Sequence, residues 1–206
     1  MSLFTTFLYE QLFVKLPYPT HDHSGQTIVV TGSNTGLGLE AARHFTRLNA
    51  GKVILAVRSL EKGENAKKSI EQTTGRRGVV EVWQLDLSSY ESTKQFAKRA
   101  EGLTRLDTVV ENAGVARDQY SILEDGESTI TINVVSTFLL GLLLLPKLRE
   151  CGKTHNTTPR LCIVTSEVHG LTKFPERNST NIFKTLNDKE TADMAARCAK
   201  ISQNPK

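Results

Sequence analysis

The fold is decided by one stretch, Thr27-Ile28-Val29-Val30-Thr31-Gly32-Ser33-Asn34-Thr35-Gly36-Leu37-Gly38-Leu39-Glu40. It opens with a short, β-branched, apolar run, which is typical of a strand buried on both faces. Three glycines follow, and residues 37–48 then show helical periodicity. A strand that ends in a glycine-rich turn and opens a helix is typical of a dinucleotide site, because glycines let the backbone approach the pyrophosphate at the helix N-terminus. The glycine spacing differs from the general Gly-x-Gly-x-x-Gly pattern.

Strands and helices continue to alternate beyond this stretch. Further strands are predicted at residues 52–57, 79–85, 106–110 and 160–164, and helices at residues 61–71, 90–102 and 127–148. This order predicts an α/β fold with a doubly wound parallel sheet, Rossmann-like and incomplete after the fifth strand.

The ends of the chain differ from this middle part. Apolar residues at helical spacing predict an amphipathic helix and loop over residues 1–24, which we expect to pack on the main domain rather than on a membrane surface. Residues 25–172 form the predicted cofactor-binding Rossmann domain. Residues 173–206 are predicted to be an incomplete, partly disordered segment with a weak helix at residues 190–199.

Composition excludes several classes of protein. The 206 residues are 38% hydrophobic and 23% charged, which supports one domain with a buried core. The longest apolar stretch, residues 138–146, is half of the roughly 18 residues that a membrane span needs. Three cysteines without metal-ligand spacing argue against a metal site or a disulfide framework and favour the reducing cytoplasm. A net charge of +4 spread along the chain argues against nucleic-acid binding.

The end of the second predicted strand bears on cofactor choice. Arg58 follows it, about twenty residues after Gly38, where an NAD-binding protein would carry an acid for the ribose. A guanidinium there offers a bidentate partner for a 2′-phosphate, and Lys62 lies one helical turn further on. The sequence therefore favours NADP over NAD. Because Glu61 is nearby, the alternative that these charges belong to an ordinary exposed helix surface stays open.

Five motifs in this order resemble the short-chain dehydrogenase/reductase superfamily, and most closely its fungal, retinol-dehydrogenase-like branch. The resemblance implies a set of cofactor-binding residues: Gly32, Ser33, Asn34, Gly36, Leu37, Gly38, Arg58, Lys62, Asp86, Leu87, Asn112, Ala113 and Gly114. Asp86 and Leu87 would meet the adenine ring. The resemblance also implies catalytic roles for Ser166, which would orient the substrate oxygen, and for Asn133 on the long predicted helix.

The pattern breaks where the resemblance requires a Tyr-x-x-x-Lys pair after Ser166. All four tyrosines precede that serine. A literal match at Tyr90 and Lys94 opens the helix after the third strand, so we interpret it as a surface pair one turn apart. Cys198 stands at the expected tyrosine position but lacks the lysine, which argues against catalysis by its thiol. We hypothesise that a shifted reading frame or an unspliced intron replaces the family's sequence from about this cysteine onward.

Two functions follow from the resemblance. The first is an NAD(P)H-dependent short-chain oxidoreductase for a ketone or secondary alcohol of a small lipophilic metabolite, in fungal secondary metabolism. The alternative is a non-catalytic NADP-binding or interaction protein, or a product that does not fold stably. Relatives commonly form homodimers through the helix matching residues 127–148; the incomplete segment that follows argues against one here.

Overall fold

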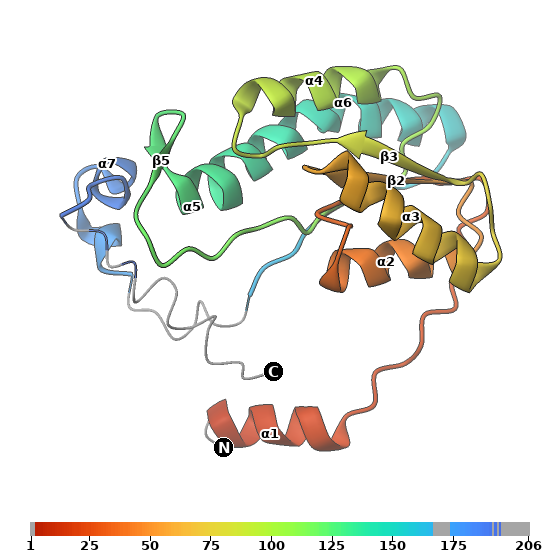
Figure 1. The fold of residues 1–206 in the computed structure, drawn as a ribbon, viewed down its shortest axis with the longest axis horizontal. Helices are drawn as coiled ribbons and strands as arrows, with labels where there is room; N and C mark the ends of the chain where they lie inside the picture. Colours follow the sequence, from red (N-terminus) through yellow and green to blue (C-terminus); the bar gives the residue numbers. More distant parts are fainter. Residues whose placement is uncertain (1–2, 167–173, 191, 193, 195–206) are drawn as a thin grey trace.

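A five-stranded parallel sheet forms the centre of the molecule (Figure 1). The computed structural model describes residues 3–166, 174–190, 192 and 194. The sheet strands are β1 (Thr27–Thr31), β2 (Lys52–Val57), β3 (Val80–Gln84), β4 (Thr108–Glu111) and β7 (Arg160–Ile163). They lie in the order β3-β2-β1-β4-β7. The chain thus adds β2 and β3 on one side of β1 and then crosses to the other side to add β4 and β7. The predicted doubly wound α/β fold is confirmed.

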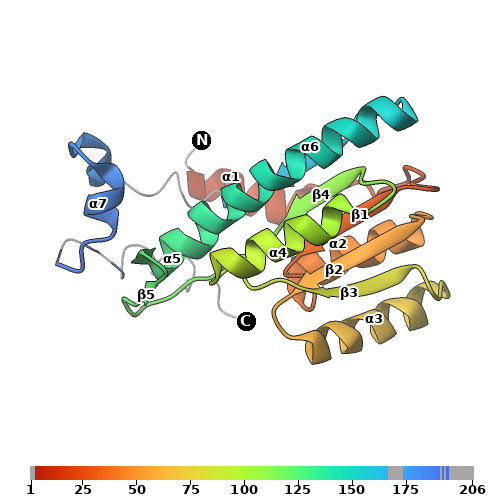
Figure 2. The same cartoon turned by 90° about the horizontal axis from the view of Figure 1, so that it is seen from above.

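Two layers of helices cover the sheet (Figure 2). One face carries α2 (Gly36–Arg47) and α3 (Leu60–Thr74), and the other carries α4 (Tyr90–Glu101) and α6 (Thr137–His155). Because side chains alternate along a strand, β1 supplies both cores. Ile28 and Val30 pack among the residues of α2 and α3, whereas Val29 packs with those of α4 and α6.

The long helix between β4 and β7 is a continuous helical run from Ser128 to His155. It consists of α5 (Ser128–Ile130), a π-helical segment η1 (Thr131–Ser136) and α6. Its length, and a mean hydropathy of 2.0 over an 18-residue window, would suffice to cross a membrane, so the sequence estimate of a short apolar stretch at residues 138–146 was wrong. Leu140, Leu144 and Leu148 nevertheless pack in the core with residues of α4, which makes this a core helix.

Residues after β4 and after β7 form smaller elements. A hairpin of β5 (Ile122–Leu123) and β6 (Gly126–Glu127) precedes α5, and β7 is followed by the 3-10 helix η3 (Pro175–Asn178) and by α7 (Ile182–Leu186). The weak helix predicted at residues 190–199 falls mostly outside the described residues. Within the described part of the C-terminal segment, α7 comes earlier in the sequence than the predicted helix.

The N-terminal helix is present as α1 (Leu3–Phe13), and its expected packing on the main domain stays a prediction, because the structure describes the side chains of only part of this helix. Tyr9, Leu12 and Phe13 are exposed. Tyr9 and Phe13 stack on each other at 5.5 Å between ring centroids. The following loop contacts the domain, where Tyr18 lies 4.3 Å under the guanidinium of Arg47 in α2.

Candidate functional site

The candidate site lies at the carboxyl edge of the sheet, where the chain turns from β1 into α2 and from β4 into the loop before β5. These two strands are neighbours but lead to helices on opposite faces. Such a switch in strand order opens a crevice above the carboxyl ends of the strands, which is the usual ligand position in open α/β sheets.

Three glycines shape the turn between β1 and α2, and each has a different surrounding. Gly32 has a φ of +65°, and a Cβ there would lie 2.9 Å from the Cα of Ala113. A Cβ on Gly38 would lie 2.5 Å from Nδ2 of Asn112, so this position admits only glycine without rearrangement. Gly36 has a φ of +58° and meets nothing within 4 Å. The turn is therefore packed tightly on its inner side and open at the N-terminus of α2, where an anion is stabilised.

The other residues predicted in this loop divide between core and surface. The hydroxyl of Ser33 is fully buried and donates to the carbonyl of Val30 at 2.8 Å, so the side chain shapes the turn and only its backbone is left for a cofactor. Asn34 is half-buried, and the side chain of Leu37 is 78% exposed. An exposed leucine beside the open end of the turn offers an apolar surface to a bound ring.

The loop after β4 is hydrogen-bonded directly to the last residue of β1. The Thr31 hydroxyl accepts hydrogen bonds from the backbone N–H groups of Asn112 and Ala113, at 3.0 and 2.9 Å. The side-chain amide of Asn112 donates to the Thr31 carbonyl at 3.0 Å. These bonds bring the predicted residues of both loops together at one place.

Asn133 lies in η1 and holds the next part of the same loop. Its Oδ1 accepts from the N–H of Val115 at 2.8 Å, and its Nδ2 donates to the Val115 carbonyl at 2.7 Å. A Cβ on Gly114 would lie 3.3 Å from the same Oδ1. The amide of Asn133 is thus engaged with the backbone, which suits a residue that positions the loop. π-Helical turns are rare and frequent at functional sites.

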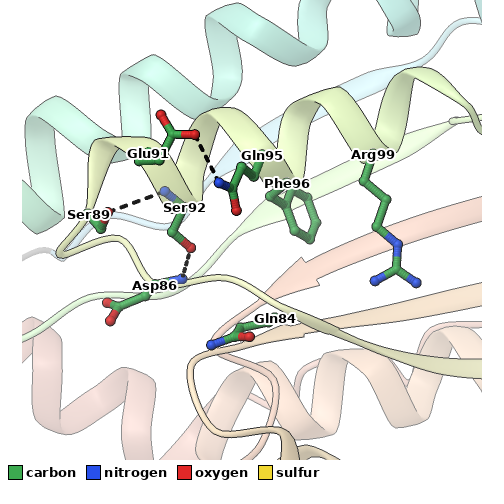
Figure 3. Close-up of a pocket in the computed structure, with 8 residues that line it drawn as sticks. All are labelled: Gln84, Asp86, Ser89, Glu91, Ser92, Gln95, Phe96 and Arg99. Atoms are coloured by element: carbon green, nitrogen blue, oxygen red, sulfur yellow. Dashed lines mark hydrogen bonds between the residues drawn. The ribbon is translucent and has the colours of Figure 1, made fainter.

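A cavity of about 480 Å³ lies beside Asp86, between the end of β3 and the first turns of α4 (Figure 3). Oδ1 of Asp86 accepts from the N–H and the hydroxyl of Ser88, at 3.0 and 2.7 Å. Two amides, two hydroxyls, a carboxylate, an aromatic ring and a guanidinium complete the lining: Gln84, Ser89, Glu91, Ser92, Gln95, Phe96 and Arg99. The side chain of Leu87, in contrast, is buried in the core, so only the backbone of this residue is left to contact a ligand.

Arg58 and Lys62 lie at the end of β2 and in the first turn of α3. Both side chains are exposed, and within the described residues neither forms an ion pair. Ser59 between them accepts a hydrogen bond from the N–H of Lys62 and caps α3. Two cationic groups therefore flank a helix N-terminus at the carboxyl edge of the sheet.

The predicted catalytic serine follows β7 on this same edge. The N–H of Val164 donates to the Glu111 carbonyl at 2.9 Å, which extends the pairing of β7 with β4 past the end of the strand. Ser166 is exposed two residues later. Cys198 and the residues around it lie outside the described part of the chain. Nor do the described residues contain a group of acids, histidines and cysteines arranged to hold a metal ion.

The surroundings of Tyr90, which the sequence interprets as part of a surface pair, argue against a catalytic role. Its hydroxyl donates to Oδ1 of Asp125 at 2.9 Å, on the turn between β5 and β6. Burial, and then the neighbouring carboxylate, raise the pKa of this phenol. A tyrosine that exchanges protons near neutral pH needs a lowered pKa instead.

Comparison with known proteins agrees with this geometry. A family model for short chain dehydrogenases matches residues 26–175. The chain belongs to this family.

Fungal short-chain dehydrogenases are among the similar proteins. The chain is 53% identical over 191 residues to the short chain dehydrogenase/reductase dmxR8 of Cryptosporiopsis sp., covering 91% of this chain and 59% of that protein. It is 51% identical over 187 residues to the short chain dehydrogenase atnD of Emericella nidulans, covering 90% of this chain and 60% of that protein. The chain therefore spans about three fifths of the length of these relatives.

A solved structure with bound cofactor is also similar. It is a Shigella flexneri chain described as a short chain dehydrogenase complexed with NADP. The TM-score is 0.58 at 28% sequence identity, and the match covers 86% of this chain and 68% of that one.

Sequence reasoning missed one buried acid beside the site of this short-chain dehydrogenase. Glu111 ends β4 and is 3% exposed, and within the described residues neither carboxylate oxygen has a hydrogen-bond partner. Burial raises the pKa of Glu111 to about 7. The carboxylate points at Gly141 of α6, where a Cβ would lie 3.2 Å from Oε1. The signal in the sequence was a charged residue at the end of an apolar strand.

Proposed function

We propose that this chain is an NADP(H)-dependent oxidoreductase acting on a ketone or secondary alcohol of a small lipophilic metabolite. The observation that carries the proposal is the turn between β1 and α2, which is packed against Ala113 and Asn112 inside and open at Gly36. This shape suits a pyrophosphate at the N-terminus of α2. The nicotinamide cofactor would supply or accept the hydride. The fungal origin of the similar dehydrogenases supports a role in secondary metabolism.

The preference for NADP rests on the end of β2. Arg58 is exposed there, with Lys62 one turn further on, and no acid occupies the position that would bind ribose hydroxyls. A guanidinium binds a phosphate with two parallel hydrogen bonds. The Shigella flexneri chain with bound NADP supports the same choice.

Replacing Arg58 tests this assignment. We expect Arg58→Ala to raise the dissociation constant of NADPH about tenfold or more, since a charge-assisted contact of this kind contributes about 1.5–3 kcal/mol. The dissociation constant of NADH should change less than about twofold. Arg77→Ala is the control, because Arg77 is exposed in the turn before β3, at the opposite end of the sheet. Fluorescence titration measures the dissociation constants of both cofactors for the wild type and the two variants, and equal losses for both cofactors in Arg58→Ala contradict the proposal.

A second candidate function is a cofactor-binding or interaction protein without turnover. The sequence favours it through one feature, since Cys198 stands where the family resemblance expects the catalytic tyrosine. NADPH oxidation followed by absorbance with a panel of lipophilic ketones distinguishes the two. Turnover supports the dehydrogenase, and tight NADPH binding without turnover supports the second function.

Cytoplasmic location, the lack of a nucleic-acid partner and the oligomeric state stay predictions from the sequence. The small-molecule substrate belongs to the proposal above. The same ketone panel identifies its chemical class.

A further inference from the structure

The first residue of α4, Tyr90, is held at both of its ends by the turn of the β5–β6 hairpin. Its backbone N–H donates to Oε1 of Glu124 at 2.8 Å, and its hydroxyl donates to Oδ1 of Asp125 at 2.9 Å. The two acceptors lie 34 and 35 residues later in the sequence, so these bonds join separate segments of the chain. We call this pair of bonds the Tyr90 clasp.

Glu124 adopts a backbone conformation that favours glycine. Its φ is +53°, in the left-handed region, where a residue with a Cβ is strained. Its carboxylate nevertheless has a favourable place at the N-terminus of α4, because the first N–H groups of a helix have no partner within that helix. The bond to the Tyr90 N–H satisfies one of these groups and offsets part of the cost of the strained turn.

The first turn of α4 also holds Asp86, the residue predicted to meet the adenine ring (Figure 3). The hydroxyl of Ser92 accepts from the Asp86 N–H at 3.0 Å, and the N–H of Ser89 donates to the Asp86 carbonyl at 3.1 Å. Ser89 directly precedes Tyr90, Ser92 follows it by two residues, and both line the cavity beside Asp86. The Tyr90 clasp therefore holds the same turn that positions Asp86.

On its other side, the hairpin contacts the helical run that carries Asn133. The hydroxyl of Thr131, in η1, donates at 3.1 Å to the carbonyl of Leu123, the residue directly before Glu124. Asn133, two residues after Thr131, holds the loop after β4 at Val115. In Figure 2 the hairpin lies beside the start of α4 and the start of this helical run. One short hairpin thus joins the Asp86 side of the site to the Asn133 side.

We propose that Tyr90 is a positioning residue, whose clasp couples the binding of the cofactor's adenine end at Asp86 to the order of the β5–β6 hairpin. This inference rests on the proposed function, because it gives the adenine end of NADP(H) a second effect at the same site. Coupling between two places in a protein is reciprocal, so a weaker clasp also weakens binding of the adenine end. The role accounts for the tyrosine of the literal match at Tyr90 and Lys94 without proton exchange.

Hydrogen exchange on the full chain tests the coupling, with 2′,5′-ADP as a probe that carries the adenine end of NADP(H) without the nicotinamide. We expect saturating 2′,5′-ADP to slow exchange of the hairpin peptide, residues 120–127, about threefold in the wild type. Tyr90→Phe loses the bond to Asp125, so its unliganded hairpin should exchange about threefold faster and respond less to the probe. The double variant Tyr90→Phe with Glu124→Ala loses both bonds, and the response to 2′,5′-ADP should disappear.

Two further variants separate the clasp from a general effect on α4. Glu124→Gln keeps an acceptor for the Tyr90 N–H and should keep most of the response to 2′,5′-ADP. Lys94→Ala is the matched control, because Lys94 is exposed one turn further along the same helix. The proposal is wrong if Lys94→Ala reduces the response as much as Tyr90→Phe does, or if the double variant responds like the wild type.

Tyr90→Phe alone decides the question if the double variant does not fold, and an unchanged response in this single variant overturns the proposal. Binding of NADPH and 2′,5′-ADP to the wild type is measured separately by fluorescence titration. A wild type that binds neither contradicts the proposed function, and with it the coupling. Binding of 2′,5′-ADP without any change in hairpin exchange contradicts the coupling alone.

Discussion

Among single residues, Glu111 is the buried acid at the sheet edge whose protonation changes with pH near neutrality. Its carboxyl is buried against Gly141 and lies next to the two residues whose N–H groups bind Thr31. Removing a carboxylate from water without a partner disfavours its charged form. The folded protein therefore holds a proton on this group at a pH where an exposed glutamate has lost it.

Replacing this acid should change how stability depends on pH. Glu111 binds its proton more tightly in the folded state, with a pKa of about 7 against an ordinary value of 4.5. Its contribution to stability is thus complete below pH 4.5 and is lost as the pH rises to about 7. We expect Glu111→Gln to match the wild type at pH 4.5 and to be more stable by about 1–3 kcal/mol at pH 8.

Urea unfolding at both pH values measures this difference. Glu101→Gln serves as the control, because Glu101 is an exposed acid at the end of α4. The same stability difference between wild type and Glu111→Gln at both pH values would mean that the buried carboxyl does not titrate in this range.

At the scale of elements, the start of α2 depends on the close approach of Gly38 to Asn112 and to the Gly32 carbonyl, which a methyl group on Gly38 would prevent. We expect Gly38→Ala to destabilise the protein by about 2–4 kcal/mol and to abolish NADPH binding, because overpacking here displaces Asn112 or the Gly32 carbonyl. Gly102→Ala is the control, since a Cβ there meets its first neighbour, the Arg99 carbonyl, at 3.5 Å. Urea unfolding and NADPH titration check both variants. Normal binding by Gly38→Ala would show that the turn adapts.

The regular elements of the domain were predictable from the sequence, and the short ones were not. The expected strand at residues 52–57 coincides with β2, and the β-branched run at residues 27–30 became β1, because burial on both faces leaves a continuous apolar signal. The β5–β6 hairpin has only two residues in each strand, too few for any periodicity. The π-helical turn η1 consists of β-branched and small polar residues, but the apolar pattern there does not distinguish it from the rest of the helix.

The candidate site shows the same division. The resemblance to short-chain dehydrogenases predicted Gly32, Gly38 and Asn112 as parts of one cofactor site, and the parallel strand order brings their loops to one edge of the sheet. The contacts of Tyr90 with Glu124 and Asp125 join residues 34 and 35 positions apart. No local pattern encodes them.

At the scale of the whole molecule, the outer face of α6 presents exposed apolar side chains suited to self-association. Phe138 and Leu142 are 54% and 64% exposed, one turn apart on a helix whose other side is buried in the core. Contiguous exposed apolar surface of this kind marks interaction sites.

The sequence argued against a homodimer, but because of these two exposed side chains we expect the protein to form dimers through this face at micromolar concentration. Leu142→Asp should shift it to a monomer by placing a charge in the contact. Light scattering after size exclusion measures the mass, with Glu150→Gln, an exposed change on the same helix, as the control. An unchanged dimer in Leu142→Asp, or a monomeric wild type, excludes this face as the interface.

The wide turn η1 also determines which insertions and deletions the gene tolerates. An α-helix advances about 100° per residue, so a π-helical turn shifts the phase of everything that follows it. That shift lets Asn133 hold Val115 while Leu140 and Leu144, further along, enter the core. Deleting a single codon within residues 131–136 would remove the extra residue of the wide turn; the helix on either side would stay in phase, but the backbone position that lets Asn133 hold Val115 would be lost. The same deletion in the surface turn that follows Asn156 would be absorbed by the loop. Reading-frame-preserving variants should therefore accumulate in that turn and be purged from η1.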